Sequence, residues 1–187
     1  GDVAAGFAEA DVIVEKDFKT AAVHQGYIEP HACLARYGAD GQGEIWSSSQ
    51  GHFVVRGLTA KIIGMNLADL KVNPAEIGGG FGGKTTLYAE PAAIMLSKKA
   101  RRPVKIVLTR SEVFRATGPA AGSYCRIKMG VKNDGTITAG EADIWYQAGA
   151  FKGSPVGRAV ETFFSPYNIP NMRAAAYDVC VNRPKVA

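Results

Sequence analysis

The chain has 187 residues, of which 47% are apolar and 21% charged, enough to bury the core of one domain or of two small ones. No apolar run approaches the roughly 20 residues that span a bilayer, so we expect no membrane contact. Much of the net charge of +5 is local, in the cluster Lys98, Lys99, Arg101 and Arg102. Because no aromatic residues are interleaved with it, this cluster is typical of a solvated helix end rather than of a nucleic-acid surface.

The three cysteines, Cys33, Cys125 and Cys180, are far apart and form no Cys-x-x-Cys pair. We therefore expect no disulfide framework, zinc site or iron–sulfur cluster in this chain. The start lacks a basic segment followed by an apolar core, which argues against a secretory signal and favours reduced thiols in the cytoplasm. Residue 1 is glycine rather than methionine, so we expect an internal piece of a longer chain.

Short β-branched or alternating runs predict strands in the first half of the chain. These strands cover Val12–Phe18, Ala32–Tyr37, Glu44–Ser49 and Ala68–Val72, the last one broken by Pro74. Apolar residues that recur at helical spacing predict a helix beginning near Gly51.

A second helix is predicted from Tyr88 to Lys99, followed by a strand over Val104–Leu108 and a short helix over Ser111–Phe114 capped by Ser111. Two alternating runs joined by Asp134-Gly135 predict a hairpin. The remaining predicted elements are a Gly- and Pro-rich loop with a short helical piece over 149–170 and a strand over 172–181. We find no internal repeat. Hairpins with separate helices predict an α+β fold, with mixed and antiparallel sheet and packed helices, as a single domain over 1–187.

The most informative segment is the loop Ile77-Gly78-Gly79-Gly80-Phe81-Gly82-Gly83-Lys84-Thr85. Five of its first seven residues lack a Cβ, so the backbone can turn tightly and expose several N–H groups to an oxygen-rich anionic ligand. The string also satisfies the P-loop pattern of nucleotide-binding proteins. Against that interpretation, the preceding residues are polar and broken by proline, and the best apolar strand ends without a carboxylate for magnesium. A plain glycine-rich turn without ligand is the other alternative.

The glycine loop resembles the cofactor loop of the molybdenum hydroxylases, the family of xanthine dehydrogenase, aldehyde oxidase and the large subunit of carbon monoxide dehydrogenase. Three further segments are similar to that family in order and spacing: Gly1–Asp11, Trp46–His52 and Arg102–Glu112. The resemblance covers nearly the whole chain. It implies that these residues are the N-terminal part of a molybdopterin-binding region, truncated before the second large domain of that region.

The resemblance implies a set of cofactor-binding residues: Gln50, Gly79, Gly80, Phe81 and Gly82. The Gln50 amide would donate a hydrogen bond to an oxo ligand, and Phe81 would shape the substrate face. Molybdenum would be held by the dithiolene of a pterin, expected in its cytosine dinucleotide form, so the protein supplies no metal ligand. The implied reaction is hydroxylation of an aldehyde, an N-heteroaromatic compound or a related small molecule, with water as the oxygen source.

Several of these residues also have an ordinary structural interpretation. Gln50 could be a capping amide and Phe81 a core anchor. Lys84 could be a surface cation, and Glu29 a surface carboxylate at a strand end. Other candidates are more typical of structural positions: His24 and His31 as satisfied histidines, and Arg110 and Glu112 as residues that fix a strand–helix turn. His52 could contact the cofactor region through its neighbour Gln50.

Two departures from the family pattern qualify the resemblance. Thr85 stands where xanthine-oxidising members carry an acid, which argues against an ordinary purine substrate. The catalytic base and most pterin contacts belong to the missing domain, so we expect no catalytic residue in this chain and no turnover by it alone. The resemblance also implies partners: the rest of the molybdopterin-binding region, and iron–sulfur and FAD domains or subunits. A P-loop-like nucleotide-binding protein and a non-catalytic scaffold domain are the alternative functions.

Overall fold

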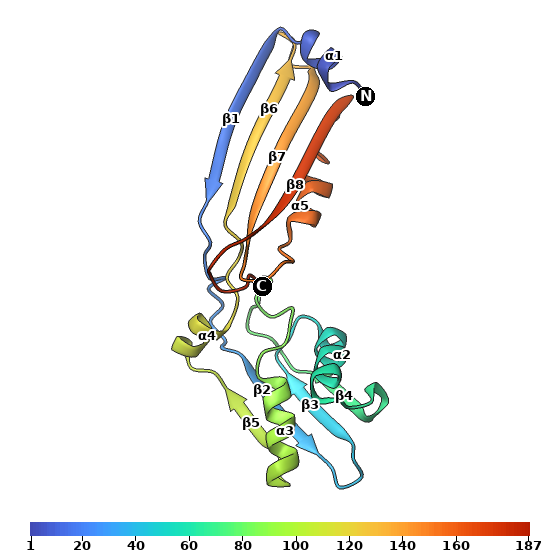
Figure 1. Ribbon diagram of the computed structural model, residues 1–187, viewed down its shortest axis with the longest axis vertical. Helices are drawn as coiled ribbons and strands as arrows, with labels where there is room; N and C mark the ends of the chain where they lie inside the picture. The colour runs from blue at the N-terminus through green and yellow to red at the C-terminus, as the bar shows by residue number, and fades with distance from the viewer. The chain divides into compact units, whose positions relative to one another are not determined.

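The computed structural model describes all 187 residues, which divide into two compact units (Figure 1). The first unit consists of Gly1–Val23 and Ala121–Val186, and the second of His24–Ala120 with Ala187. The sequence predicted one domain, whereas the contacts within the chain separate into these two groups, so each unit is described by itself. None of the helices is both long and apolar enough to cross a membrane.

The first unit is built on a four-stranded sheet of order β1-β6-β7-β8. Its strands are β1 (Val12–Thr20), β6 (Ser123–Val131), β7 (Ile137–Gly149) and β8 (Asn171–Cys180). The first three pair antiparallel, and β8 pairs parallel to β7 after a crossover that contains α5 (Val156–Thr162). The predicted hairpin is confirmed, since β6 and β7 are joined at Gly135, whose φ of 90° requires glycine.

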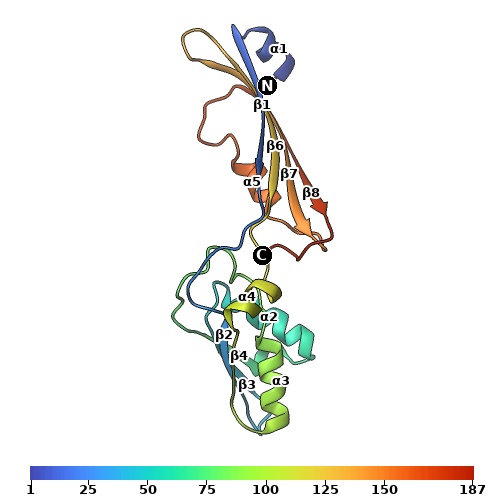
Figure 2. The same cartoon turned by 90° about the vertical axis from the view of Figure 1, so that its left-hand side faces the viewer.

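Helix α5 covers one face of this sheet, as Figure 2 shows, and a short helix, α1 (Val3–Ala8), packs at its end. The core between α5 and the sheet contains Ala142, Ile144, Val156, Phe164 and Ile169. Successive strand residues point to opposite faces, so the other face carries the polar and aromatic side chains of β6, β7 and β8.

The second unit has a sheet of order β4-β3-β2-β5. Its strands are β2 (Ala32–Tyr37), β3 (Gly43–Ser47), β4 (Leu70–Pro74) and β5 (Val104–Val107). Its helices are α2 (His52–Ile63), the single 3₁₀ turn η1 (Leu67–Asp69), α3 (Glu90–Ala100) and α4 (Arg110–Ala116). A core formed by Ile45, Leu70 and Ile94 lies between the sheet and helices α2 and α3.

The two sheets have the same pattern of strand pairing, which the sequence did not reveal. In each, a hairpin is followed by a helix and then by a strand parallel to the second hairpin strand, and a fourth strand adds antiparallel to the first. Parallel neighbours require such a crossover. The predicted α+β class, with mixed sheets and packed helices, is confirmed.

Two local predictions are wrong. The strand predicted over Ala68–Val72 begins with a 3₁₀ turn and continues to Pro74, which is tolerated because β4 is an edge strand. Helix α4 is capped by Thr109 rather than Ser111. The Thr109 hydroxyl accepts from the Glu112 N–H, and the Glu112 carboxylate accepts from the Thr109 N–H, which forms a capping box.

Candidate functional site

The glycine loop lies in the second unit between β4 and α3, and its backbone uses conformations that favour glycine. Gly79 and Gly82 both have φ of 91°, and Phe81 has φ of 49°. A positive φ is uncommon for a residue with a side chain, so the loop holds Phe81 in a strained conformation. Its ring is 72% exposed, and the alternative that Phe81 is a core anchor is therefore wrong.

Protein side chains lie directly against four of the five loop glycines. A Cβ added to Gly78 would lie 2.6 Å from Glu29 Cβ, and one added to Gly83 would lie 2.7 Å from the Tyr27 ring. At Gly80 it would lie 2.5 Å from the Gln50 side-chain oxygen, and at Gly79 it would lie 3.1 Å from Tyr27 Cβ. Glycine is thus required here because the segment around Tyr27, and Gln50, pack on the loop.

A buried ion pair fixes one end of the loop. Lys84 Nζ lies 2.5 Å from the Glu29 carboxylate, and the Lys84 side chain is fully buried while that of Glu29 is 32% exposed. Glu29 also accepts from the N–H of Gly78 at 2.7 Å. Partial burial raises the pKa of Glu29, but the hydrogen bonds from Lys84 and Gly78 and the Lys84 charge outweigh it, so the net pKa is lowered. The interpretation of Lys84 as a surface cation is wrong.

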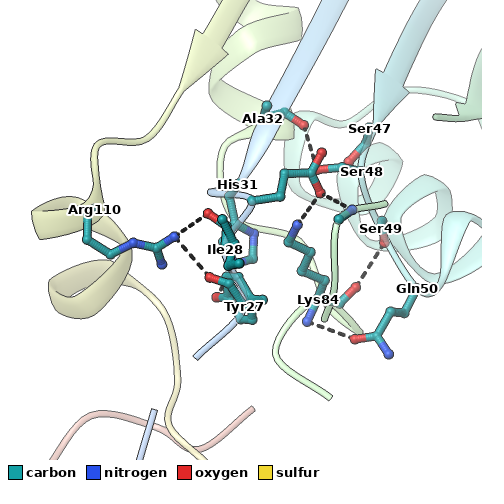
Figure 3. A network of polar contacts seen from close by, with 12 residues as sticks. Tyr27, Ile28, His31, Ala32, Ser47, Ser48, Ser49, Gln50, Lys84 and Arg110 are labelled. Carbon is teal, nitrogen blue, oxygen red and sulfur yellow. Dashed lines mark hydrogen bonds and ion pairs between the residues drawn. The ribbon is translucent and has the colours of Figure 1, made fainter. Parts of the chain in front are cut away.

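Gln50, three residues after the end of β3, holds the backbone of the loop at Gly82 and Lys84. The side-chain Oε1 of Gln50 accepts from the backbone N–H groups of Gly82 and Lys84, both at 3.1 Å. The backbone N–H of Gln50 donates to the Lys84 carbonyl at 2.8 Å. In Figure 3 the Lys84 backbone meets the Gln50 amide while its side chain runs away in the opposite direction. Because two donors meet the same amide atom, that atom must be the oxygen, and the amide NH₂ points away from both.

Behind the loop lies a layer formed by Tyr27, His31 and Arg110 (Figure 3). The Tyr27 hydroxyl and His31 Nε2 are 2.7 Å apart, and Arg110 donates to the carbonyls of Tyr27 and Ile28 at 2.9 and 2.6 Å. Burial, followed by the charge of Lys84, lowers the pKa of His31 to about 4, so this histidine is neutral at pH 7. These contacts fit the structural role expected of His31. Arg110 orients the segment that carries Glu29 rather than its own strand–helix turn.

The site carries hydrogen-bond donors that no group of the chain accepts from. The NH₂ of the exposed Gln50 has no partner within the chain, and neither do the N–H groups of Gly80 and Phe81. An added Cβ at Gly82 would meet nothing within 4 Å, so the loop is open at that point. Unpaired donors beside free space fit an oxygen-rich, anionic group such as an oxo-metal centre or a pterin phosphate. The residues present therefore fit a molybdopterin cofactor.

The structure brings together the predicted residues Gln50, Gly79, Gly80, Phe81 and Gly82. His52 does not join them, since its Nε2 lies 3.1 Å from the Ser47 carbonyl, and His24 Nδ1 accepts from Gly26 N–H at 3.1 Å. Sequence reasoning missed the roles of Glu29 and Tyr27. No sequence signal indicated either role, because Glu29 and Tyr27 are more than 50 positions from Lys84.

The geometry does not support the P-loop alternative. Residues 75–89 separate β4 from α3, so the glycines are not at the N-terminus of a helix. The Lys84 ammonium, which would contact phosphates in a P-loop, is buried against Glu29 instead.

Comparisons with known proteins show the family of this chain. The model of the family described as "Molybdopterin cofactor-binding domain" matches residues 1–187. The xanthine dehydrogenase of Emericella nidulans is 32% identical over 178 residues, covering 92% of this chain and 13% of that protein. The nicotinate dehydrogenase large molybdopterin subunit of Eubacterium barkeri is 29% identical over 187 residues, covering 98% of this chain and 44% of the subunit.

Solved structures show the same fold. The aldehyde oxidoreductase from Desulfovibrio gigas aligns with a TM-score of 0.85 at 27% identity, over 100% of this chain and 21% of its own. The CO dehydrogenase from Oligotropha carboxidovorans aligns with a TM-score of 0.84 at 26% identity, over 98% of this chain and 24% of its own. The chain thus spans less than half the length of these relatives. It belongs to the molybdopterin cofactor-binding domain family of the molybdenum hydroxylases.

Proposed function

We propose that Gln50 and the glycine loop form one side of a molybdenum–molybdopterin site in an oxidoreductase that hydroxylates an aldehyde, an N-heteroaromatic compound or a related substrate, with water as the oxygen source. One observation carries this proposal. The N–H groups of Gly82 and Lys84 hold the Gln50 amide oxygen, which leaves the amide NH₂ as a pre-oriented donor.

In this proposal each residue has a distinct task. Gln50 donates to an oxygen ligand of the metal, and the open backbone at Gly82 leaves room for the group. The exposed ring of Phe81 forms part of the wall that meets the substrate. Glu29 and Lys84 hold the loop in place. When bound, the cofactor supplies a metal centre that accepts two electrons and transfers an oxygen derived from water.

Further parts of the protein complete the proposal. We assign the catalytic base and the remaining pterin contacts to other segments of a longer chain, and electron transfer to iron–sulfur and FAD domains or subunits. The cofactor form is the cytosine dinucleotide, and the compartment is the cytoplasm. The span 1–187 acts as one functional module, which is supported by a single family model covering both units. On this proposal residues 1–187 alone bind the cofactor weakly and have no turnover.

The test uses the full-length protein with the substitution Gln50→Glu. Glutamate keeps an oxygen that accepts from Gly82 and Lys84 but removes the NH₂ donor. We expect dye-linked oxidation of aldehydes or N-heteroaromatics to fall about 100-fold while the fold is retained, because one pre-organised donor contributes about 10²–10³ in rate at such sites. Gln42→Glu, in an exposed turn, is the matched control.

Molybdenum content, measured by mass spectrometry on the same samples, separates the outcomes. Molybdenum in the wild type, with a loss of rate or occupancy in Gln50→Glu alone, supports the proposal. A full-length wild-type protein that contains no molybdenum would favour the scaffold alternative, and an unchanged rate in Gln50→Glu would remove Gln50 from the site.

A further inference from the structure

Helix α5 covers one face of the sheet in the first unit. The opposite face has a hollow at one end. Side chains of this face form two neighbouring rows across the strands. One row contains Lys19, Tyr124, Trp145 and Tyr177, and the next contains Gly122, Gln147 and Val179. A cavity of about 460 Å³ lies along these two rows, and its lining includes Lys19, Tyr124, Trp145, Gln147 and Arg183.

One wall of the hollow is aromatic. Trp145 lies between Tyr124 and Tyr177, with ring centroids 5.3 and 5.1 Å away, and is nearly parallel to Tyr177 at 13°. Such a row holds its rings rigidly, since each ring packs against its neighbour. Tyr124 is held further by its hydroxyl, which donates to Asp17 at 2.7 Å. The wall therefore offers a planar apolar ligand a preformed surface.

The lining of the hollow includes Gln147, whose amide has an unpartnered donor. Gln147 Nε2 is buried and forms no hydrogen bond within the chain. Directly after Gln147 the β7–β8 ladder shifts register, so the regular pairing of the two strands ends beside the hollow. A buried amide donor normally has an acceptor, and a rotation of the Gln147 amide toward the hollow would let a ligand supply one.

Two unpaired cations lie at the rim, Lys19 on β1 and Arg183 after β8. Neither forms an ion pair, whereas two other arginines of this face do: Arg126 with Asp17, and Arg173 with Glu141 and Asp143. Arg183 is held in place by its backbone, because its carbonyl accepts from the Ala150 N–H at 3.0 Å. The cationic rim selects an anion.

We propose that this hollow binds a small planar carboxylate, with its ring against Tyr124 and Trp145, its carboxylate at Lys19 or Arg183, and an acceptor atom at Gln147. The site lies wholly within the first unit and uses none of the residues of the glycine loop. It is therefore a second site, and the proposal is independent of the cofactor assignment.

Benzoate is the probe, with benzamide as its uncharged counterpart, titrated into the full chain carrying Trp46→Phe so that Trp145 alone reports by fluorescence. We expect saturable quenching by benzoate and at least tenfold weaker binding of benzamide, because a charge-assisted hydrogen bond is lost. The double variant Lys19→Gln/Arg183→Gln should weaken benzoate binding by at least tenfold, and Gln147→Leu should also weaken it.

Lys16→Gln is the matched control, since Lys16 lies on the same strand as Lys19 but on the other sheet face, and it should bind benzoate like the wild type. Lys19 and Arg183 are exposed, so their variants remain informative if Gln147→Leu fails to fold. The proposal is overturned by equal binding of benzamide, by unchanged binding in the double variant, or by the absence of saturable quenching up to about 10 mM benzoate.

Discussion

The Glu29–Lys84 ion pair is asymmetric at the level of single residues, because the lysine is fully buried and the glutamate is 32% exposed. Glu29→Gln leaves a buried ammonium without a counter-charge, and we expect it to lower the free energy of unfolding of the second unit by about 3 kcal/mol. Lys84→Met removes the buried charge and leaves a carboxylate that water can reach, so it should cost less. Urea unfolding followed by Trp46 fluorescence, in a Trp145→Phe background, measures both.

The double variant Glu29→Gln/Lys84→Met is the control for this interpretation. It removes both charges at once, so it should be more stable than Glu29→Gln alone. If Lys84→Met proves more damaging than Glu29→Gln, the cost of leaving the ammonium unpaired is not what destabilises the unit, and the assignment of the ion pair as the fixing point of the loop is wrong.

His31 makes the second unit sensitive to acid. Burial and the Lys84 charge lower its pKa to about 4, against 6.5 for an ordinary histidine. Between these two values the unfolded chain binds a proton that the folded chain does not, so stability falls as the pH falls from 6.5 to 4. We expect this to lower the free energy of unfolding by about 3 kcal/mol. His24, whose pKa burial also lowers, adds a change of the same sign.

Urea unfolding at several pH values between 7 and 4 tests this expectation. In His31→Gln the pH dependence should become shallower, and adding His24→Gln should make it shallower still. An unaltered slope in His31→Gln would mean that other groups cause the acid sensitivity. Glu29 acts only at lower pH, because its lowered pKa lets its contribution disappear below about 4.5.

At this scale the sequence predicted the residues of the site but not what holds them. Gln50 and the loop glycines are contiguous patterns and were accessible through a family resemblance. Glu29 precedes Lys84 by 55 positions, and no local pattern indicates which of many acids will meet a given lysine. The predicted reason for the glycines was close approach to the cofactor. The structure adds that Tyr27, Glu29 and Gln50 themselves occupy the space where most of their side chains would be.

At the scale of elements, the C-terminal end of helix α3 is a position where a substitution should increase stability. Its C-cap residue is Arg101, in the left-handed region with φ of 53°, where glycine is usual. A side chain in this conformation costs about 1 kcal/mol, and Arg101 forms no ion pair that offsets it. We expect Arg101→Gly to raise the free energy of unfolding by about 0.5–1 kcal/mol, measured by urea unfolding with Trp46 as the probe.

Arg101→Ala is the matched control for this change. It removes the same charge and the same long side chain but keeps a Cβ in the left-handed conformation, so it should leave stability nearly unchanged. Equal stabilisation by alanine and glycine would show that charge repulsion with Lys98 and Arg102, rather than the backbone conformation, is relieved.

Elements with a strong local signal were predicted well, and pairing between distant elements was not. The β6–β7 hairpin follows from alternation and an Asp-Gly turn, both readable within about 25 residues. The parallel pairs β3–β4 and β7–β8 depend on where a crossover helix returns the chain, which no local pattern specifies. Thr109 and Glu112 have capping-box spacing, but Ser111 is also a favourable cap, and propensity alone does not decide between the two positions.

At the scale of the molecule, the two units share one pattern of strand pairing but differ in how the chain builds them. The second unit is continuous from His24 to Ala120 and contains all four strands of its sheet. The first unit is assembled from two chain segments, one that precedes the second unit in the sequence and one that follows it. β1 comes from the first segment and pairs with β6 along its whole length, from Val12 to Thr20, and the Asp2 N–H donates to the Asn171 side chain at 2.8 Å.

This difference leads to an expectation about fragments. Residues 24–120 carry a complete sheet and their own core, so this fragment should fold alone, with dispersed amide resonances and a cooperative thermal transition. Residues 121–186 lack β1 and would leave the edge of β6 unpaired, which promotes aggregation rather than a monomeric fold. A synthetic peptide of residues 1–23 should bind the second fragment and restore its native circular dichroism, whereas the same peptide with Val14→Pro should not, since proline removes a ladder hydrogen bond. If residues 121–186 fold equally well without the peptide, or residues 24–120 remain unfolded, the division into two separately cored units does not describe how this chain folds.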